Sequence, residues 1–308
     1  MQYVKQEITA FTSTNLTDIY ADWNPATTYI LETDNENLTN ASVVRYGAYY
    51  YRSVTNGNLN FNPLQYENIK WVKIGVSNKF GLIDLSSQSK SIVEGGNLTV
   101  TFPQNKIRTL GLGNYEADTI TIEVLDSNGT TVLWTYSTDS SINDNVIDYY
   151  TYIYEDYNYD VDRAIKLDIG VDGSFIRVTL NKSTEATRTA CGFLVGGVAI
   201  NMGNTLMGIK FNFNSFADKN LDALGTLTIT KRAVQDLIDF ETTVEAGRLP
   251  DMRREIKKVY NDIVMFILDE NDVGNYENLL TLGVIQDSSV LLENHVEAIL
   301  SFSIMEAI

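Results

Sequence analysis

The chain has 308 residues, of which 44% are hydrophobic, and its formal net charge is −17. This length suits two or three domains with sizeable cores. A body this acidic repels nucleic-acid phosphates, which argues against a nucleic-acid partner. The single cysteine excludes an intrachain disulfide framework. No window approaches the length of a membrane-spanning helix, so we expect no membrane insertion.

The first 22 residues predict an extended arm. Residues 1–22 alternate only weakly between apolar and polar side chains and end in a polar run at residues 12–18, so they cannot form a core alone. Arms of this kind often add as a strand to a neighbouring sheet, which pairs their exposed backbone groups. The first residues show no apolar signal segment, so we expect a protein made in the cytoplasm.

Residues 23–80 are rich in aromatic side chains and predict a small β-meander module. The candidate carbohydrate-binding residues are Trp23, Tyr46, Tyr51 and Trp71, because an aromatic face suits the polarised C–H groups of a sugar ring. The alternative is that these rings form the core of a small domain that has few aliphatic side chains. Both interpretations predict the same fold, and only the exposure of the rings separates them.

The spacing of these aromatic residues resembles the small chitin-binding-type carbohydrate module of glycoside hydrolases. The residues that carry this resemblance are Trp23, Tyr29, Val44, Tyr46, Tyr51 and Trp71. A longer run resembles a junction of tailed-phage virion proteins, W-[IV]-x-[IL]-G-x-[TS]-N-[RK]-[FWY], which leads from such a module into a second β-domain. The matching residues are Trp71, Val72, Ile74, Gly75, Ser77, Asn78, Lys79 and Phe80. The turn Gly47-Ala48 departs from the usual Asn-Gly hairpin turn.

Residues 81–215 predict a β-sandwich of jelly-roll type, because short alternating strands are separated by regular turn signals. The predicted strands are residues 98–102, 120–125, 131–136, 164–169 and 175–180. A strong hairpin turn, Asp126-Ser127-Asn128-Gly129, joins the second and third of them. The apolar, glycine-punctuated run at residues 192–203 predicts a buried strand against which others pack closely.

Residues 216–308 predict an α+β domain with a β-α-β-β unit. The predicted strands are residues 226–230, 233–243, 263–268, 276–284 and 295–305, and the predicted helix is residues 250–262. Met252, Ile256 and Val259 recur at helical spacing on one face of that helix. At fold level this order resembles the small α+β units with which phage tail, connector and baseplate proteins build rings.

The search for catalytic residues, cofactor-binding motifs and metal ligands is negative, so we expect a protein that is not an enzyme and needs no cofactor. His295 is the only histidine and has no companion for a metal site or a catalytic triad. Cys191 lies in an apolar setting and predicts a buried, inert thiol. The glycines at residues 95–96 and 111–113 lack the Lys-Ser/Thr of a phosphate loop.

The segment from 139 to 162 interleaves aspartates and glutamates with six tyrosines. A long acidic excursion between strands is favoured over a calcium site, because the EF-hand spacing is absent. A protein-contact surface is a further alternative, since tyrosine is enriched at interfaces.

Two hypotheses about function follow. The resemblance implies a non-enzymatic structural protein of a bacteriophage virion, in the tail tip, baseplate or connector ring. Its partners would be copies of itself and other tail or connector proteins, with binding of a host-surface glycan as an accessory activity. The alternative is a carbohydrate-binding receptor or adhesin, in which the four aromatic residues of the module grip a cell-surface glycan.

Overall fold

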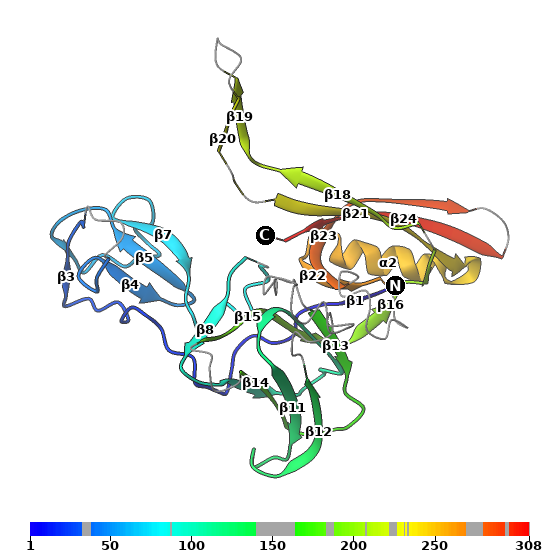
Figure 1. Ribbon diagram of the computed structural model, residues 1–308, viewed down its shortest axis with the longest axis horizontal. Helices are drawn as coiled ribbons and strands as arrows, with labels where there is room; N and C mark the ends of the chain where they lie inside the picture. The colour runs from blue at the N-terminus through cyan, green and yellow to red at the C-terminus, as the bar shows by residue number, and fades with distance from the viewer. Residues whose placement is uncertain are drawn as a thin grey trace, which may run out of the picture.

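The computed structural model is mainly β, with several sheets and a short α-helix near the C-terminus, which confirms the predicted fold class (Figure 1). It describes residues 1–32, 38–86, 88–139, 164–182, 188–206, 208–221, 227–230, 232, 234–268, 280–292 and 296–307. His295 and all but the first residue of the acidic segment 139–162 lie outside these ranges. Within them, no helix combines the length and apolarity needed to cross a bilayer.

The aromatic module forms two small antiparallel sheets. The two-stranded sheet pairs β3 (Thr28–Tyr29) with β6 (Asn58–Leu59). The three-stranded sheet has the order β4-β5-β7, with bounds Val43–Tyr46, Tyr49–Ser53 and Trp71–Val76. The two-residue turn between β4 and β5 places Gly47 at a φ of 62°, a conformation that glycine adopts without steric cost.

The central part is a β-sandwich. Its strands are β8 (Ser91–Glu94), β9 (Leu98–Pro103), β10 (Thr109–Glu116), β11 (Thr119–Leu125), β12 (Val132–Asp139), β13 (Ala164–Asp168), β14 (Phe175–Asn181) and β15 (Arg188–Gly197). One sheet has the order β13-β10-β15-β8 and the other the order β12-β11-β14-β9, extended by β2 (Ser13–Thr14). Eight strands in this order make two interleaved Greek keys, which is the jelly-roll topology.

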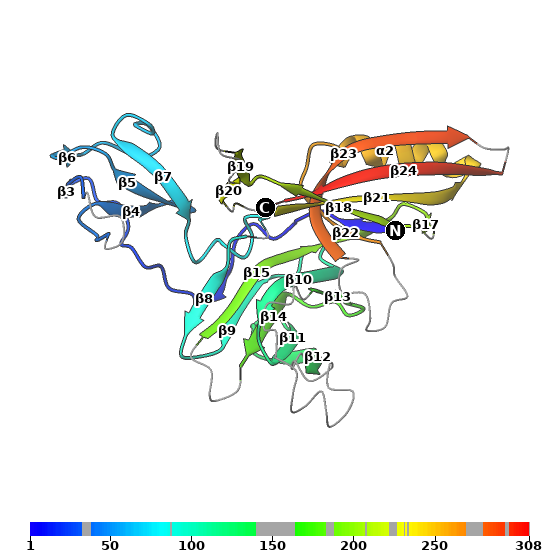
Figure 2. The ribbon, with the colours of Figure 1, turned by 45° about the horizontal axis from the view of Figure 1, so that its top comes forward.

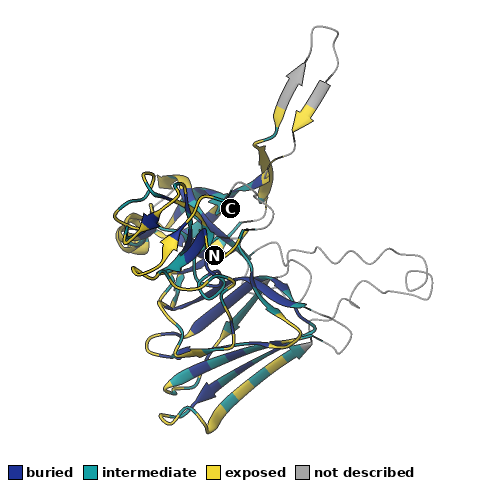
Figure 3. Cartoon of the chain, turned by 90° about the vertical axis from the view of Figure 1, so that its left-hand side faces the viewer, coloured by how far each residue is buried: buried dark blue, intermediate teal, exposed yellow. Residues whose placement is uncertain are grey.

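The sandwich core follows from strand alternation. In β11, Ile120, Ile122 and Val124 are fully buried, whereas the intervening residues are partly exposed. Because successive strand side chains point to opposite faces, this pattern places one face of each sheet inside. Figure 3 shows buried positions along the strands of both sheets. The same core takes in Cys191, which is fully buried as predicted.

Two strands of the sandwich, β8 and β10, were not predicted from the sequence. In β10 the apolar alternation is interrupted by Gly111 and Gly113. A side chain at Gly111 would collide with Met265, and one at Gly113 would collide with the ring of Phe193. These glycines therefore make room for large side chains from other strands, a role that local periodicity does not reveal.

The C-terminal part is a single eight-stranded sheet covered by a helix on one face. The path through the sheet is β16-β1-β22-β23-β24-β21-β17, and β18 also pairs with β21. The bounds are β16 (Ala199–Asn201), β17 (Asn204–Thr205), β18 (Lys210–Ser215), β21 (Val234–Glu245), β22 (Val264–Ile267), β23 (Leu280–Leu292) and β24 (Glu297–Glu306). Helix α2 (Leu249–Val259) follows the 3₁₀ turn η2 (Ala246–Arg248) and buries Met252, Ile256 and Val259 against the sheet.

The first residues of the chain belong to this C-terminal sheet. Strand β1 (Gln2–Val4) is completely buried and lies antiparallel between β16 and β22. Strands β16, β17 and β18 pair with the same sheet although they lie within residues 81–215, which the sequence assigns to the sandwich. The long apolar run at residues 192–203 is therefore two strands, which pass from one sheet to the next.

The sandwich and the C-terminal sheet share a hydrophobic cluster. Its buried members are Val4, Phe193, Val195, Met265, Ile267 and Leu282. They come from the arm, the sandwich and the C-terminal sheet, so burial of this apolar surface ties the three segments together. In Figure 2 the sandwich lies directly below the sheet, whereas the aromatic module extends to one side.

A β-hairpin extends away from this body. It consists of β19 (Asp218–Leu221) and β20 (Leu227–Thr230), and it continues from the end of β18 (Figure 1, Figure 3). All six residues of β18 are exposed. The hairpin forms a separate two-stranded sheet among the described residues, and an isolated hairpin of this kind is marginally stable in water.

Candidate functional site

Two of the four candidate sugar-binding residues form the core of the module. The side chain of Trp71 has 0% exposure, and its Nε1 donates a hydrogen bond to the carbonyl oxygen of Phe61 at 2.7 Å. Tyr29 packs edge-on against it, with ring centroids 5.2 Å apart. Tyr51 has 2% exposure, and burial raises its pKa. Neither Trp71 nor Tyr51 can offer a ring face to a sugar in this conformation.

The other two candidates lie at the surface of that core. Trp23 and Tyr46 are both partly buried and pack edge to face, with centroids 5.8 Å apart and planes at 82°. The hydroxyl of Tyr46 accepts a hydrogen bond from Nδ2 of Asn62 at 2.7 Å. The Nε1 of Trp23 is shielded from solvent and has no hydrogen-bond partner. These two rings keep some surface that a ligand can reach.

Further aromatic rings of the module, which the sequence did not single out, already have partners. Phe61 and Tyr66 pack edge-on with centroids 4.9 Å apart, and Lys70 lies 5.2 Å from the Phe61 centroid. Lys73 Nζ lies 3.6 Å above the centroid of Tyr49. A cation above an aromatic face occupies the side on which a sugar would stack. The run of consecutive tyrosines at 49–51 was the signal that could have drawn attention to Tyr49.

Asp18 connects the arm, the aromatic module and the junction that follows it. Its Oδ1 accepts hydrogen bonds from the Tyr50 hydroxyl at 3.1 Å and from the backbone nitrogen of Lys79 at 3.2 Å. Its Oδ2 lies 3.1 Å from the guanidinium of Arg45. Because the Asp18 side chain is only 6% exposed, these contacts are shielded from solvent and hold the arm, the module and the junction together.

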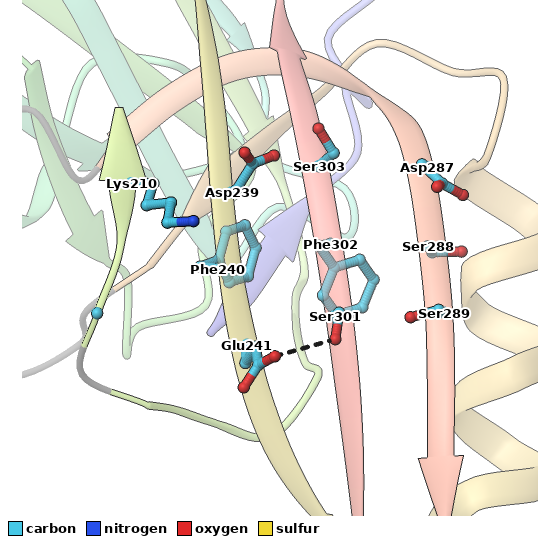
Figure 4. Close-up of a pocket in the computed structure, with 11 residues that line it drawn as sticks. Lys210, Asp239, Phe240, Glu241, Asp287, Ser288, Ser289, Ser301, Phe302 and Ser303 are labelled. Atoms are coloured by element: carbon cyan, nitrogen blue, oxygen red, sulfur yellow. Dashed lines mark hydrogen bonds between the residues drawn. The ribbon is translucent and has the colours of Figure 1, made fainter. Parts of the chain in front are cut away.

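An open polar depression lies on the C-terminal sheet, on the face opposite helix α2 (Figure 4). Its volume is about 310 Å³. The polar side chains that line it are Lys210, Asp239, Glu241, Asp287, Ser288, Ser289, Ser301 and Ser303. The hydroxyl of Ser301 donates to Glu241 Oε1 at 3.4 Å, and Phe240 stacks on Phe302 within the sheet. This arrangement offers polar groups for contact with a partner.

The chemistry available for metals and nucleophilic catalysis is limited in the part of the chain that the structure describes. No group of three histidine, cysteine, aspartate or glutamate side chains there is placed to hold a metal ion. Burial raises the pKa of the Cys191 thiol to about 12, and its Sγ lies 3.5 Å from the carbonyl oxygen of Phe193. A thiol with so high a pKa is a poor nucleophile at neutral pH.

Neither a protein-family model nor a curated protein matches this chain. The resemblance to tailed-phage virion proteins therefore depends on the residues of the module and its junction. Of these, the structure gives Trp71 a core position and Asn78 a position between the module and the sandwich.

Proposed function

We propose that this protein is a non-enzymatic structural component of a tailed-phage virion, in the tail tip, baseplate or connector ring. In this proposal it acts by docking to copies of itself and to other tail or connector proteins. The resemblance of residues 23–80 to a virion module supports the assignment to a phage, and the exposed surface of the C-terminal part supports the docking role.

The observation that carries the docking role is the projecting hairpin with its neighbouring edge strand. Phe213 is 70% exposed, and Phe216 and Ile229 are about half exposed, at 46% and 50%. Exposed apolar side chains that gather in one region are typical of protein-interaction sites. Aromatic side chains are also enriched in the buried centres of interfaces.

Particle composition tests the proposed function. Phage particles that are purified from an infected culture should contain the protein, as detected by mass spectrometry. Immunogold labelling should place it on the tail. A protein that is produced during infection but absent from purified particles would contradict the proposal.

A second candidate function is recognition of a cell-surface glycan, which the geometry of Trp23 favours. Its ring packs edge to face with Tyr46, and both residues are only partly buried. An accessible aromatic face suits the polarised C–H groups of a sugar ring. The site would be smaller than the four-residue platform expected from the sequence, because Tyr51 and Trp71 are buried.

Binding of chitin oligosaccharides and of host cell-wall polysaccharide, measured by calorimetry, tests this second function. Trp23→Ala should abolish binding, whereas Leu64→Ala, at an exposed residue of the same module, should leave it unchanged. Absence of binding by the wild-type protein to any surface polysaccharide of the host would exclude glycan recognition.

A further inference from the structure

The outer edge of β18 is open. Its inner edge pairs with β21 over six residues, from Lys210 opposite Asp239 to Ser215 opposite Val234. No strand among the described residues pairs with its other edge. An exposed edge carries a row of unpaired N–H and C=O groups, which favour pairing with another strand.

Natural sheets usually protect such an edge, and the sequence of β18 itself carries little of the usual protection. It has the sequence KFNFNS, without a proline and without a register shift in its pairing to β21. Charged side chains discourage edge pairing, but Lys210, at one end, is the only charge on the strand. Phe211 and Phe213 are 41% and 70% exposed and, two residues apart, lie on the same face.

Charge distinguishes this edge from the rest of the protein. The chain carries a net charge of −17, so two copies repel each other over most of their surface. Residues 210–215 contain no carboxylate. The Asp239 carboxylate beside the strand accepts a hydrogen bond from Nδ2 of Asn212 at 2.9 Å. The edge is therefore a place where a second copy can approach with little repulsion.

We propose that β18 pairs antiparallel with β18 of a second copy about a twofold axis through Asn212. This inference deepens the proposed function, on which it rests, by naming the surface through which copies assemble. In this register Phe211 of each copy lies opposite Phe213 of the other, so four phenylalanine rings gather on one face. Cross-strand aromatic pairs stabilise such a sheet, and a twofold interface uses the same patch on both copies.

The exposed aromatic rings near the edge would form the apolar centre of such an interface. A phenylalanine side chain buries 150–250 Å² in full. From the exposed fractions of Phe211, Phe213 and Phe216, the three rings offer roughly 300 Å² of accessible surface per copy. The three rings would thus supply a little over a third of the roughly 800 Å² per partner of a standard interface. The hairpin β19–β20 follows the end of β18, so in the pair the two hairpins leave from opposite ends of the paired strands.

Sedimentation velocity with charge variants tests the proposal. The wild-type protein should form a dimer. Phe213→Lys should raise the dimer dissociation constant by more than about tenfold, because it places two lysines in the interface. Leu291→Lys is the matched control, since Leu291 is 61% exposed at the far end of the same sheet. It should leave the dimer unchanged. Equal circular dichroism spectra of both variants would exclude unfolding as the cause.

Cysteine crosslinking tests the register. Asn212→Cys should form a disulfide-linked dimer under mild oxidation, because residues on the twofold axis lie opposite each other within disulfide reach. Asp172→Cys, at an exposed position of the sandwich, should not, and the native Cys191 is too deeply buried to compete.

Two outcomes would overturn the proposal. A wild-type protein that stays monomeric at every soluble concentration would exclude pairing of copies through β18. An oligomer that survives Phe213→Lys and gives no crosslink at position 212 would place the interface elsewhere, while leaving self-assembly in the proposed function intact. Presence in purified virions is measured separately, so failure of the interface and failure of the virion role are distinguishable.

Discussion

The side chain of Asn78 pairs with the backbone of Ile92 in both directions. The Ile92 N–H donates to Asn78 Oδ1 at 2.7 Å, and Asn78 Nδ2 donates to the Ile92 carbonyl oxygen at 2.8 Å. The same Nδ2 donates to the carbonyl oxygen of Thr17 at 2.9 Å. The Asn78 side chain thus satisfies the N–H and C=O of a β8 residue, as the backbone of a neighbouring strand would. The same side chain links the module and the arm to the sandwich.

We expect Asn78→Ala to loosen this junction. The substitution leaves the partly buried N–H and C=O of Ile92 without their partners, at a cost of about 1–3 kcal/mol in the free energy of unfolding. Urea denaturation should show the loss, and limited proteolysis should cut faster between the module and the sandwich. Asn97→Ala, at a nearby exposed asparagine, is the control and should change neither. Unchanged proteolysis of Asn78→Ala would show that other contacts hold the junction.

Trp71→Ala should unfold the aromatic module. Removing a fully buried aromatic side chain from a small core costs about 3–5 kcal/mol. Trp71→Phe should cost less, because it keeps most of the apolar volume and loses the hydrogen bond to Phe61. Thermal unfolding followed by near-ultraviolet circular dichroism measures both. A Trp71→Ala protein with a wild-type melting curve would mean that the ring is not part of the core in solution.

Alanine should destabilise the protein at Gly197 but not at Gly96. A Cβ at Gly197 would collide with the carbonyl oxygen of Lys5, which belongs to the backbone and cannot rotate away, so Gly197→Ala should destabilise by about 1–3 kcal/mol. At Gly96 the nearest atom to an added Cβ is 3.9 Å away. Gly96→Ala should therefore be neutral or stabilise by up to about 1 kcal/mol, through the unfolded chain. Chemical denaturation of both variants and of the wild-type protein measures the change in the free energy of unfolding for each.

Glu116 should contribute to stability at neutral pH and lose that contribution in acid. Burial raises the pKa of this carboxyl, but hydrogen bonding to Lys90 at 2.9 Å and the charges of Lys90 and Arg188 outweigh it, so the net shift is downward. A carboxyl whose pKa is lower in the folded state stabilises the protein above its unfolded pKa, and the effect disappears as the pH falls through the folded pKa.

Glu116→Gln should therefore lower the melting temperature at pH 7, while the two proteins converge below about pH 4, the usual range for glutamate. Because Glu116 is about a quarter exposed, with 27% of its side chain accessible, the difference at pH 7 should stay near 1 kcal/mol. A constant difference across this pH range would assign the effect to packing rather than to charge.

The sequence by itself determined the parts of the fold that depend on local pattern. Alternation in residues 98–102, 120–125 and 175–180 predicted β9, β11 and β14, since each strand buries one face against the same core. The spacing of Met252, Ile256 and Val259 likewise predicted the buried face of α2. These features depend only on the spacing of apolar residues along the sequence and on the burial of apolar side chains away from water.

Only the tertiary structure decided the features that depend on partners distant in sequence. The aromatic spacing of the module fits a core and a binding platform equally well, and packing buries Trp71 and Tyr51 while leaving Trp23 and Tyr46 partly open. β10 went unpredicted because its glycines accommodate side chains from other strands. β1 lies inside the C-terminal sheet because it pairs with strands about 200 residues away or more. Such contacts arise when the sheets assemble, so no local window of the sequence contains them.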